Sequence, residues 1–118
     1  MQRNELGRWA EIKSLNYLKK RGLKFISKNF HGPGGEIDLI MRENNTIVFI
    51  EVKCRSNNEF YHPVEAIDKN KCKRITCTGE YFLLNNKLND SECRFDVILI
   101  TGNKQIHEIE WIKNAFQA

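Results

Sequence analysis

Hydrophobic and polar positions follow two different periods along this chain, and each period predicts its own kind of element. Residue types over positions 4–21 favour a helix, and the pair Arg21-Gly22 is a typical helix stop. A second helix is predicted from a first turn at Pro63, with Glu65 near its positive end, to about Asn85. Short apolar stretches bounded by turn residues predict strands at 23–29, 35–42, 46–53 and 94–101, with a weaker candidate at 105–109.

The predicted order of elements is αβββαβ, within a single domain that covers residues 1–118. The composition of residues 31–35 indicates a loop, and Asn44-Asn45 indicates a tight turn between the second and third strands. A helix that crosses over between the third and fourth strands allows these two strands to be parallel. The sequence therefore predicts an α/β fold, with a mixed sheet flanked by helices.

The composition, with 41% hydrophobic and 29% charged residues, is that of an ordinary globular domain. No apolar run is long enough to span a bilayer, and the N-terminal segment lacks the apolar region of a secretory signal. We therefore expect a cytoplasmic protein without a membrane partner. Cys54, Cys72, Cys77 and Cys93 form no CxxC pair and the three histidines stand alone, so reduced thiols are a better interpretation than a zinc site or disulfides.

The net charge of +4 is modest but unevenly distributed. Residues 1–28 hold eight Lys or Arg residues against two Glu, and a second basic cluster starts at Lys69. Basic clusters attract polyanions and make their binding dependent on salt, although solvated helix faces have the same composition. The candidates for contacts with the phosphates of DNA are Lys13, Lys19, Lys20, Arg21, Lys69, Lys71, Lys73 and Arg74.

Three charged residues, Asp38, Glu51 and Lys53, interrupt the apolar pattern of the second and third predicted strands. A two-residue turn at positions 44–45 would place Asp38 directly opposite Glu51, with Cβ atoms about 4.5–5.5 Å apart. Two carboxylates so close need a cation, which is either Lys53, on the same strand face as Glu51, or a divalent metal such as Mg²⁺ or Mn²⁺. A metal there would polarise a phosphodiester and activate a water, whereas the alternative is a structural ion cluster at the strand end.

Each predicted helix also carries a charged residue within an apolar stripe. Glu11 shares a stripe with Leu15 and Leu18, and Lys71 lies four residues before Ile75. These two residues are either at the rim of the core or, together with the charged strand residues, part of an ionic pocket.

Two further features leave alternatives open. Gly34-Gly35 either lets a phosphate backbone approach closely or forms a plain turn. Arg94 and Asp96 share a strand face, where they either pair with each other or belong to a functional site.

The segments GRWAEIKSLNYLKKRG, GGEIDLI, VFIEVKCR, RFDVILI and IEWIKNAF resemble the YraN family of predicted endonucleases over almost the whole chain. More broadly they resemble the PD-(D/E)XK nuclease superfamily, and the YraN family is similar to archaeal Holliday-junction resolvases. The resemblance implies a restriction-endonuclease-like αβββαβ core with Glu11, Asp38, Glu51 and Lys53 as catalytic residues. It also implies that Asp38, Glu51 and Glu11 bind Mg²⁺ or Mn²⁺. Ala10 departs from the family, which often has Gly before this Glu.

Two functions follow as expectations. The first is a metal-dependent endodeoxyribonuclease that hydrolyses DNA phosphodiester bonds, on branched or structured DNA in repair or recombination. The alternative is a non-catalytic module on a nuclease fold that binds nucleic acid or acts as a scaffold. Junction cutting calls for two active sites and hence a homodimer. Trp111, Ile112 and Phe116 either form that interface or pack on their own chain.

Overall fold

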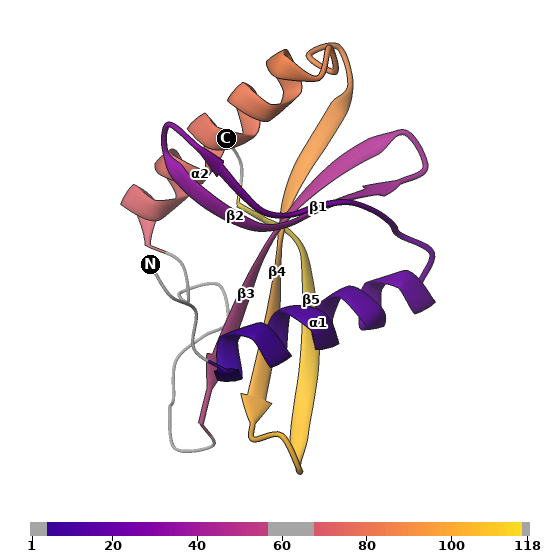
Figure 1. Ribbon diagram of the computed structural model, residues 1–118, viewed down its shortest axis with the longest axis vertical. Coiled ribbons are helices and arrows are strands. Elements are labelled where there is room, and N and C mark those ends of the chain that lie inside the picture. The colour runs from indigo at the N-terminus through magenta and orange to yellow at the C-terminus, as the bar shows by residue number, and fades with distance from the viewer. Residues whose placement is uncertain (1–4, 57–67, 117–118) are drawn as a thin grey trace.

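The computed structural model describes residues 5–56 and 68–116, and these fold into a five-stranded sheet with helices packed on it (Figure 1). The strands lie in the order β1-β2-β3-β4-β5, with β3 and β4 parallel and the other neighbours antiparallel. The predicted mixed α/β sheet is confirmed. The elements in chain order are α1 (Glu5–Lys20), β1 (Lys24–Gly32), β2 (Gly35–Glu43), β3 (Thr46–Arg55), α2 (Lys69–Asn85), β4 (Glu92–Gly102) and β5 (His107–Phe116).

The alternating side chains of β3 divide the core into two layers. Val48 and Ile50 pack with residues of α1, whereas Ile47 and Phe49 pack with residues of α2. The two helices therefore cover opposite faces of the sheet, and burial on both faces explains why β3 is almost continuously apolar. Within the described ranges, neither helix is long and apolar enough to cross a membrane.

The β1–β2 hairpin is longer than predicted, and the expected loop between the strands is wrong. β1 continues to Gly32, which pairs with Gly35, so only a two-residue turn remains. That turn lies against α2: the Gly34 N–H donates to Thr78 Oγ1 at 3.0 Å. A Cβ atom on Gly34 would clash with the carbonyl oxygen of Arg74. The glycine pair forms a turn, and at Gly34 the backbone of α2 lies close to it.

The described part of α2 begins later than the sequence predicted. Asp68 is its N-cap, because its Oδ1 accepts a hydrogen bond from the Lys71 backbone N–H at 2.7 Å. Such a cap satisfies one of the free N–H groups at a helix start. Pro63 and Glu65, on which the earlier start was based, lie outside the described residues. The helix ends at Asn85, as predicted.

The two-residue turn at positions 44–45 and the register that it sets between β2 and β3 are confirmed. Pairing continues from the turn as far as Leu39 and Ile50, which lie opposite each other. The next pair in the same register is Asp38 and Glu51, where the described ladder has ended. The sheet therefore brings the two carboxylates together at the point where β2 and β3 stop pairing.

The last strand, β5, is longer than the weak strand predicted at 105–109. Its residues pair with β4, and its apolar side chains pack against other residues of the same chain. Trp111 donates from Nε1 to Asp96 Oδ2 at 2.9 Å, and the ring of Phe116 stacks on Phe95. Ile112 lies opposite Val97 in the same strand pair. The C-terminal apolar residues thus pack on their own chain, which was one of the two interpretations.

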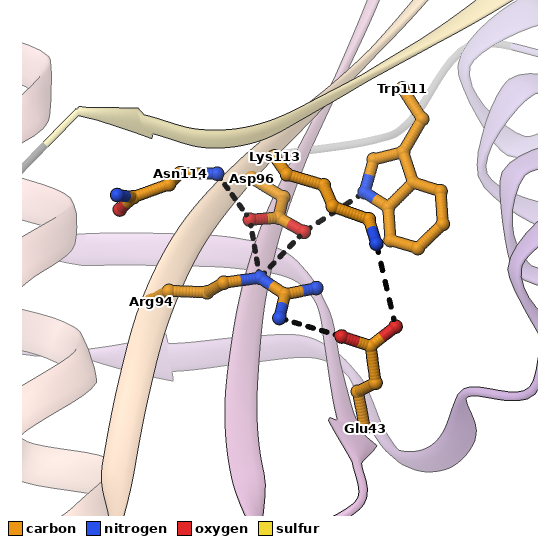
Figure 2. A network of polar contacts seen from close by, with 6 residues as sticks. All are labelled: Glu43, Arg94, Asp96, Trp111, Lys113 and Asn114. Carbon is orange, nitrogen blue, oxygen red and sulfur yellow. Dashed lines mark hydrogen bonds and ion pairs between the residues drawn. The ribbon is translucent and has the colours of Figure 1, made fainter.

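A polar network joins the three strands β2, β4 and β5 (Figure 2). Arg94 donates through Nε to both oxygens of Asp96, at 3.0 and 3.2 Å, and through Nη1 to Glu43 at 2.7 Å. Asp96 also accepts from the Asn114 backbone N–H at 2.9 Å, and Lys113 Nζ lies 3.7 Å from Glu43. Arg94 and Asp96 therefore pair with each other, in a network in which each carboxylate has a cation beside it.

Replacing Gly34 by alanine should destabilise the fold by about 3 kcal/mol, because the new Cβ meets backbone of α2, which moves only if the helix shifts. Urea denaturation measures this loss. Gly22→Ala is the matched control. Gly22 has φ 98°, and a Cβ atom added there would have no other atom within 4 Å, so only backbone strain of about 1 kcal/mol is expected. Equal losses in the two variants would contradict the contact between the hairpin and α2.

Candidate functional site

The candidate site lies where the carboxyl end of β3 meets the first turns of α1 and α2. Because β3 and β4 are parallel, the chain must return along the sheet between them, so α2 starts beside the carboxyl end of β3. A hollow of about 280 Å³ opens there. Its lining residues are Leu6, Gly7, Ala10, Glu11, Asp38, Val52, Cys54 and Lys71.

Asp38 and Glu51 are each held by a backbone N–H of the opposite strand. Asp38 Oδ2 accepts from the Val52 N–H at 2.8 Å, and the Asp38 N–H donates to Glu51 Oε1 at 3.4 Å. The strands have stopped pairing here, so the carboxylates satisfy backbone donors that the ladder leaves open. The same bonds fix both carboxylates next to each other.

Glu51 carries a charge in an unfavourable position. Its side chain is only 4% exposed. Burial, and next the negative charge of Asp38, raise the pKa of Glu51 from 4.5 to about 7. Lys71 lies with Nζ 3.2 Å from Glu51 Oε2 and lowers the pKa, but by less than the other two effects raise it. The charge of Glu51 is therefore incompletely compensated, and such perturbed carboxylates are frequent at functional sites.

Lys71, rather than Lys53, makes the close ion pair with Glu51. Burial alone would lower the pKa of Lys71, but the Glu51 carboxylate raises it above its ordinary value. Lys53 is half-buried, and burial and then the adjacent Lys71 ammonium lower its pKa. The sequence pattern predicts Lys71 as a phosphate contact and a member of an ionic pocket, and Lys53 as the compensating charge. Only the crossover of α2 brings Lys71 to this carboxylate.

Glu11 lies in the stripe that the sequence predicted, and is 5% exposed. Its Oε1 accepts from the side-chain amide of Asn29 at 3.1 Å, and it lines the same hollow as Asp38. No sequence pattern pointed to Asn29, which lies on β1 with a positive φ of 55°. Over residues 5–56 and 68–116, no three His, Cys, Asp or Glu side chains are close enough to hold one metal ion. Glu11 therefore stands beside the Asp38–Glu51 pair without joining it in a three-carboxylate cluster.

The Asp38–Glu51 pair by itself fits a divalent metal. Mg²⁺ is usually held by one or two protein carboxylates, with waters and substrate phosphate oxygens as its other ligands. Burial and the Asp38 charge disfavour the ionised form of Glu51, and a cation beside the pair would act against both effects. Two oxygen ligands without Cys or His suit Mg²⁺ or Mn²⁺ better than zinc.

Of the candidate phosphate contacts, those on α2 lie in the part of the helix that begins beside the site. Lys71 is in it, and Lys69, Lys73 and Arg74 lie within the first two turns of the same helix. Lys13 is exposed on α1, two residues beyond Glu11.

The other basic residues lie farther away. Lys19, Lys20 and Arg21 are exposed at the C-terminal end of α1, eight to ten residues beyond Glu11, which is about 12–15 Å along the helix axis. Arg21 also stacks on the ring of Tyr17, with 3.4 Å between guanidinium carbon and ring centroid. The structure thus divides the predicted phosphate contacts into a group at the site and a remote group.

Residues 10–100 match the family described as "Uncharacterised protein family UPF0102". A UPF0102 protein of Coxiella burnetii (strain RSA 331) is 43% identical over 114 residues, which cover 96% of this chain and 92% of the relative. A UPF0102 protein of Lachnoclostridium phytofermentans is 43% identical over 119 residues, covering 100% and 98%. One of Idiomarina loihiensis is 42% identical over 118 residues, covering 98% and 100%. These descriptions name a family and no activity.

Glu51→Gln should remove a pH-dependent loss of stability. The folded pKa of Glu51, about 7, exceeds its ordinary value of 4.5, so the folded state binds this proton more tightly than the unfolded state. The resulting stability is fully present below pH 4.5 and is lost as the pH rises through 7. From pH 4.5 to about 8, the unfolding free energy of the wild type should fall relative to Glu51→Gln by on the order of 1–3 kcal/mol.

Urea denaturation in the absence of metal, at a series of pH values, measures this difference. Glu110→Gln, which neutralises an exposed carboxylate on β5, is the control and should follow the wild-type profile. If the unfolding free energy of Glu51→Gln changes with pH in the same way as that of the wild type, burial does not disfavour the Glu51 charge.

Proposed function

Because the chain belongs to the family described as uncharacterised protein family UPF0102, whose description states no activity, we propose a function from the site itself: metal-dependent hydrolysis of DNA phosphodiester bonds. The observation that carries the proposal is the buried Glu51 carboxylate beside Asp38, with a pKa raised to about 7. A purely structural ion cluster would be expected to stabilise its charges, as the network around Arg94 does. At this pair the Glu51 charge instead stays unfavourable, beside an open hollow.

Each group around the hollow has a role in this reaction. Asp38 and Glu51 would hold the metal, and backbone N–H groups hold both carboxylates in place. When bound, a divalent metal polarises the phosphodiester and lowers the pKa of a water for attack. The Lys53 ammonium, beside the pair, orients that water or neutralises charge that develops on the phosphate. Glu11 lines the hollow from α1 and adds a carboxylate that accepts hydrogen bonds there.

The resemblance to the PD-(D/E)XK nuclease superfamily supports the same assignment. It places Asp38 on one strand and Glu51-x-Lys53 on the next, with Glu11 on the first helix. The similarity to Holliday-junction resolvases extends the proposal to branched or structured DNA, in repair or recombination. Lys69 and Lys73, exposed on the first two turns of α2, provide contacts for the phosphate backbone.

Two observations favour the alternative, a module on a nuclease fold that binds nucleic acid without turnover. Lys71 already pairs with Glu51, and the described residues gather no third ligand around the carboxylates. A metal-free structural cluster would have these features. A Glu51→Ala variant that binds DNA as tightly as the wild type and complements a deletion strain would support this alternative.

The purified protein with Mg²⁺ or Mn²⁺ should cleave at least one of plasmid, single-stranded, flap and four-way-junction DNA. Asp38→Asn and Glu51→Gln should each lose more than about 100-fold in rate, because each removes a carboxylate that would hold the metal on which the reaction depends. Glu110→Gln, whose exposed carboxylate on β5 does not line the hollow, should cleave normally. Thermal melts with and without metal report binding, since a ligand stabilises only the state that binds it. Metal binding without cleavage of any of these DNAs would contradict the proposal.

Neutralising Lys69 and Lys73 together should weaken DNA binding at every sequence, because phosphate contacts carry no sequence information. The slope of log affinity against log salt should become less steep by about 2. Fluorescence anisotropy at several salt concentrations measures both effects. The control is Arg42→Gln with Lys87→Gln, two exposed basic residues near the far ends of β2 and α2. An unchanged slope for the Lys69 and Lys73 pair would show that α2 does not contact DNA.

A further inference from the structure

The ammonium of Lys71 lies at an oxygen that a metal ion in this site would need. Its Nζ is 3.2 Å from Glu51 Oε2, while Glu51 Oε1 faces the Asp38 backbone N–H at 3.4 Å. Both oxygens of the buried carboxylate therefore already have a partner. Mg²⁺ binds carboxylate oxygens at about 2.0–2.1 Å, and two cations so close repel each other. A metal on Oε2 and the Lys71 ammonium at its present position therefore compete for the carboxylate.

The side chain of Lys71 can move away from Glu51, although its backbone is held. The backbone N–H donates to the Asp68 cap at 2.7 Å, and α2 is held by the hairpin through Thr78. The side chain is 31% exposed, and a flexible aliphatic stem carries its ammonium beside the hollow. A rotation of that side chain is enough to move the ammonium from Glu51 into the hollow. No movement of the helix is required.

The displaced ammonium has a ready partner if the site binds DNA. Lys71 lines the hollow together with Asp38 and Glu11, and Lys53 is adjacent to it. A phosphate oxygen entering the hollow would pair with the released ammonium. Without a phosphate, the released Lys71 ammonium has no new partner. A metal ion then has to compete with the Lys71–Glu51 ion pair for the carboxylate.

We infer that Lys71 is a placeholder cation: it occupies Glu51 until a divalent metal and a phosphate replace the ion pair together. The inference rests on the proposed metal site and deepens it, because it makes metal binding weak in the free protein and stronger when DNA is present. Lys71 is then a positioning residue before metal binds and a phosphate contact afterwards. By linkage, metal also strengthens the binding of DNA by the same factor.

Calorimetric titration with Mn²⁺ tests the competition directly. Lys71→Met keeps most of the side-chain volume and removes the ammonium, so the dissociation constant for Mn²⁺ should fall at least tenfold. Lys87→Met is the control, because it removes the same charge from an exposed position just beyond the far end of α2 and should change the constant less than threefold. Lys71→Arg keeps a cation at Glu51 and should bind Mn²⁺ as weakly as the wild type. Glu51→Gln should abolish binding in every background.

A second measurement uses the wild-type chain and does not depend on the folding of a variant. Brief acetylation followed by mass spectrometry reports how accessible the Lys71 amine is. Its rate should rise at least threefold when Mn²⁺ alone is added at a concentration that saturates the site, because the ammonium is then released from Glu51 with no phosphate to cover it, whereas the rate at Lys87, just beyond the far end of α2, should not change. An unchanged or lower rate at Lys71 in saturating Mn²⁺ would contradict its release from Glu51.

The outcomes separate this inference from the proposed function. Wild type that binds Mn²⁺, with Lys71→Met binding no tighter than Lys87→Met, would overturn the placeholder role and leave the metal site intact. Mn²⁺ binding by Lys71→Met but not by wild type would support the inference strongly. Absence of binding in the wild type and in all these variants, with and without DNA, would overturn the metal site and the inference with it.

Discussion

The burial of one negative charge determines how the candidate site is built. Glu51 lies near the end of an apolar strand, beside the start of α2, and its side chain is 4% exposed. A charge removed from water needs a partner, because desolvation costs several kcal/mol per ion. The Lys71 ammonium on α2 is that partner, whereas the negative charge of Asp38 on the neighbouring strand disfavours the Glu51 charge. The docking of α2 and the separation of β2 from β3 therefore both act on the same carboxylate.

The connection between β3 and β4 places the partner there. Parallel strands require a return path along the sheet, so α2 starts at the carboxyl end of β3, and Lys71 falls in its first turn. The β1–β2 turn then fixes the position of the helix through Gly34 and Thr78, since only a glycine fits against the helix backbone at that point. The geometry of the site is thus set by contacts that lie outside it.

The two polar clusters of the sheet show opposite solutions to the burial of charge. Around Arg94, two carboxylates and two cations balance, and Trp111 and Asn114 donate the remaining hydrogen bonds to Asp96 (Figure 2). The hydrogen bond from Arg94 lowers the pKa of Glu43, against the opposing effect of burial. At Glu51 the pKa is raised instead. Proteins retain such unfavourable charges mainly where a function uses them, at some cost in stability.

Features that depend on local pattern could be predicted along the chain. The alternation of apolar residues predicted the strands and their faces, and Asn44-Asn45 predicted a register that brings Asp38 next to Glu51. The helical stripe placed Glu11 on a buried face. These features depend on periods of 2 and 3.6 residues, which are visible in the order of residue types.

Contacts between distant groups carry no such local signal. The partner of Glu51 is Lys71 instead of Lys53. The crossover between β3 and β4 brings the first turn of α2 to Glu51, and a contact between such distant residues leaves no periodic pattern in the sequence. The docking of Gly34 on that helix and the full length of β5 depend equally on elements far apart in the chain. Packing and charge balance over the whole fold select such contacts, and they override local propensity.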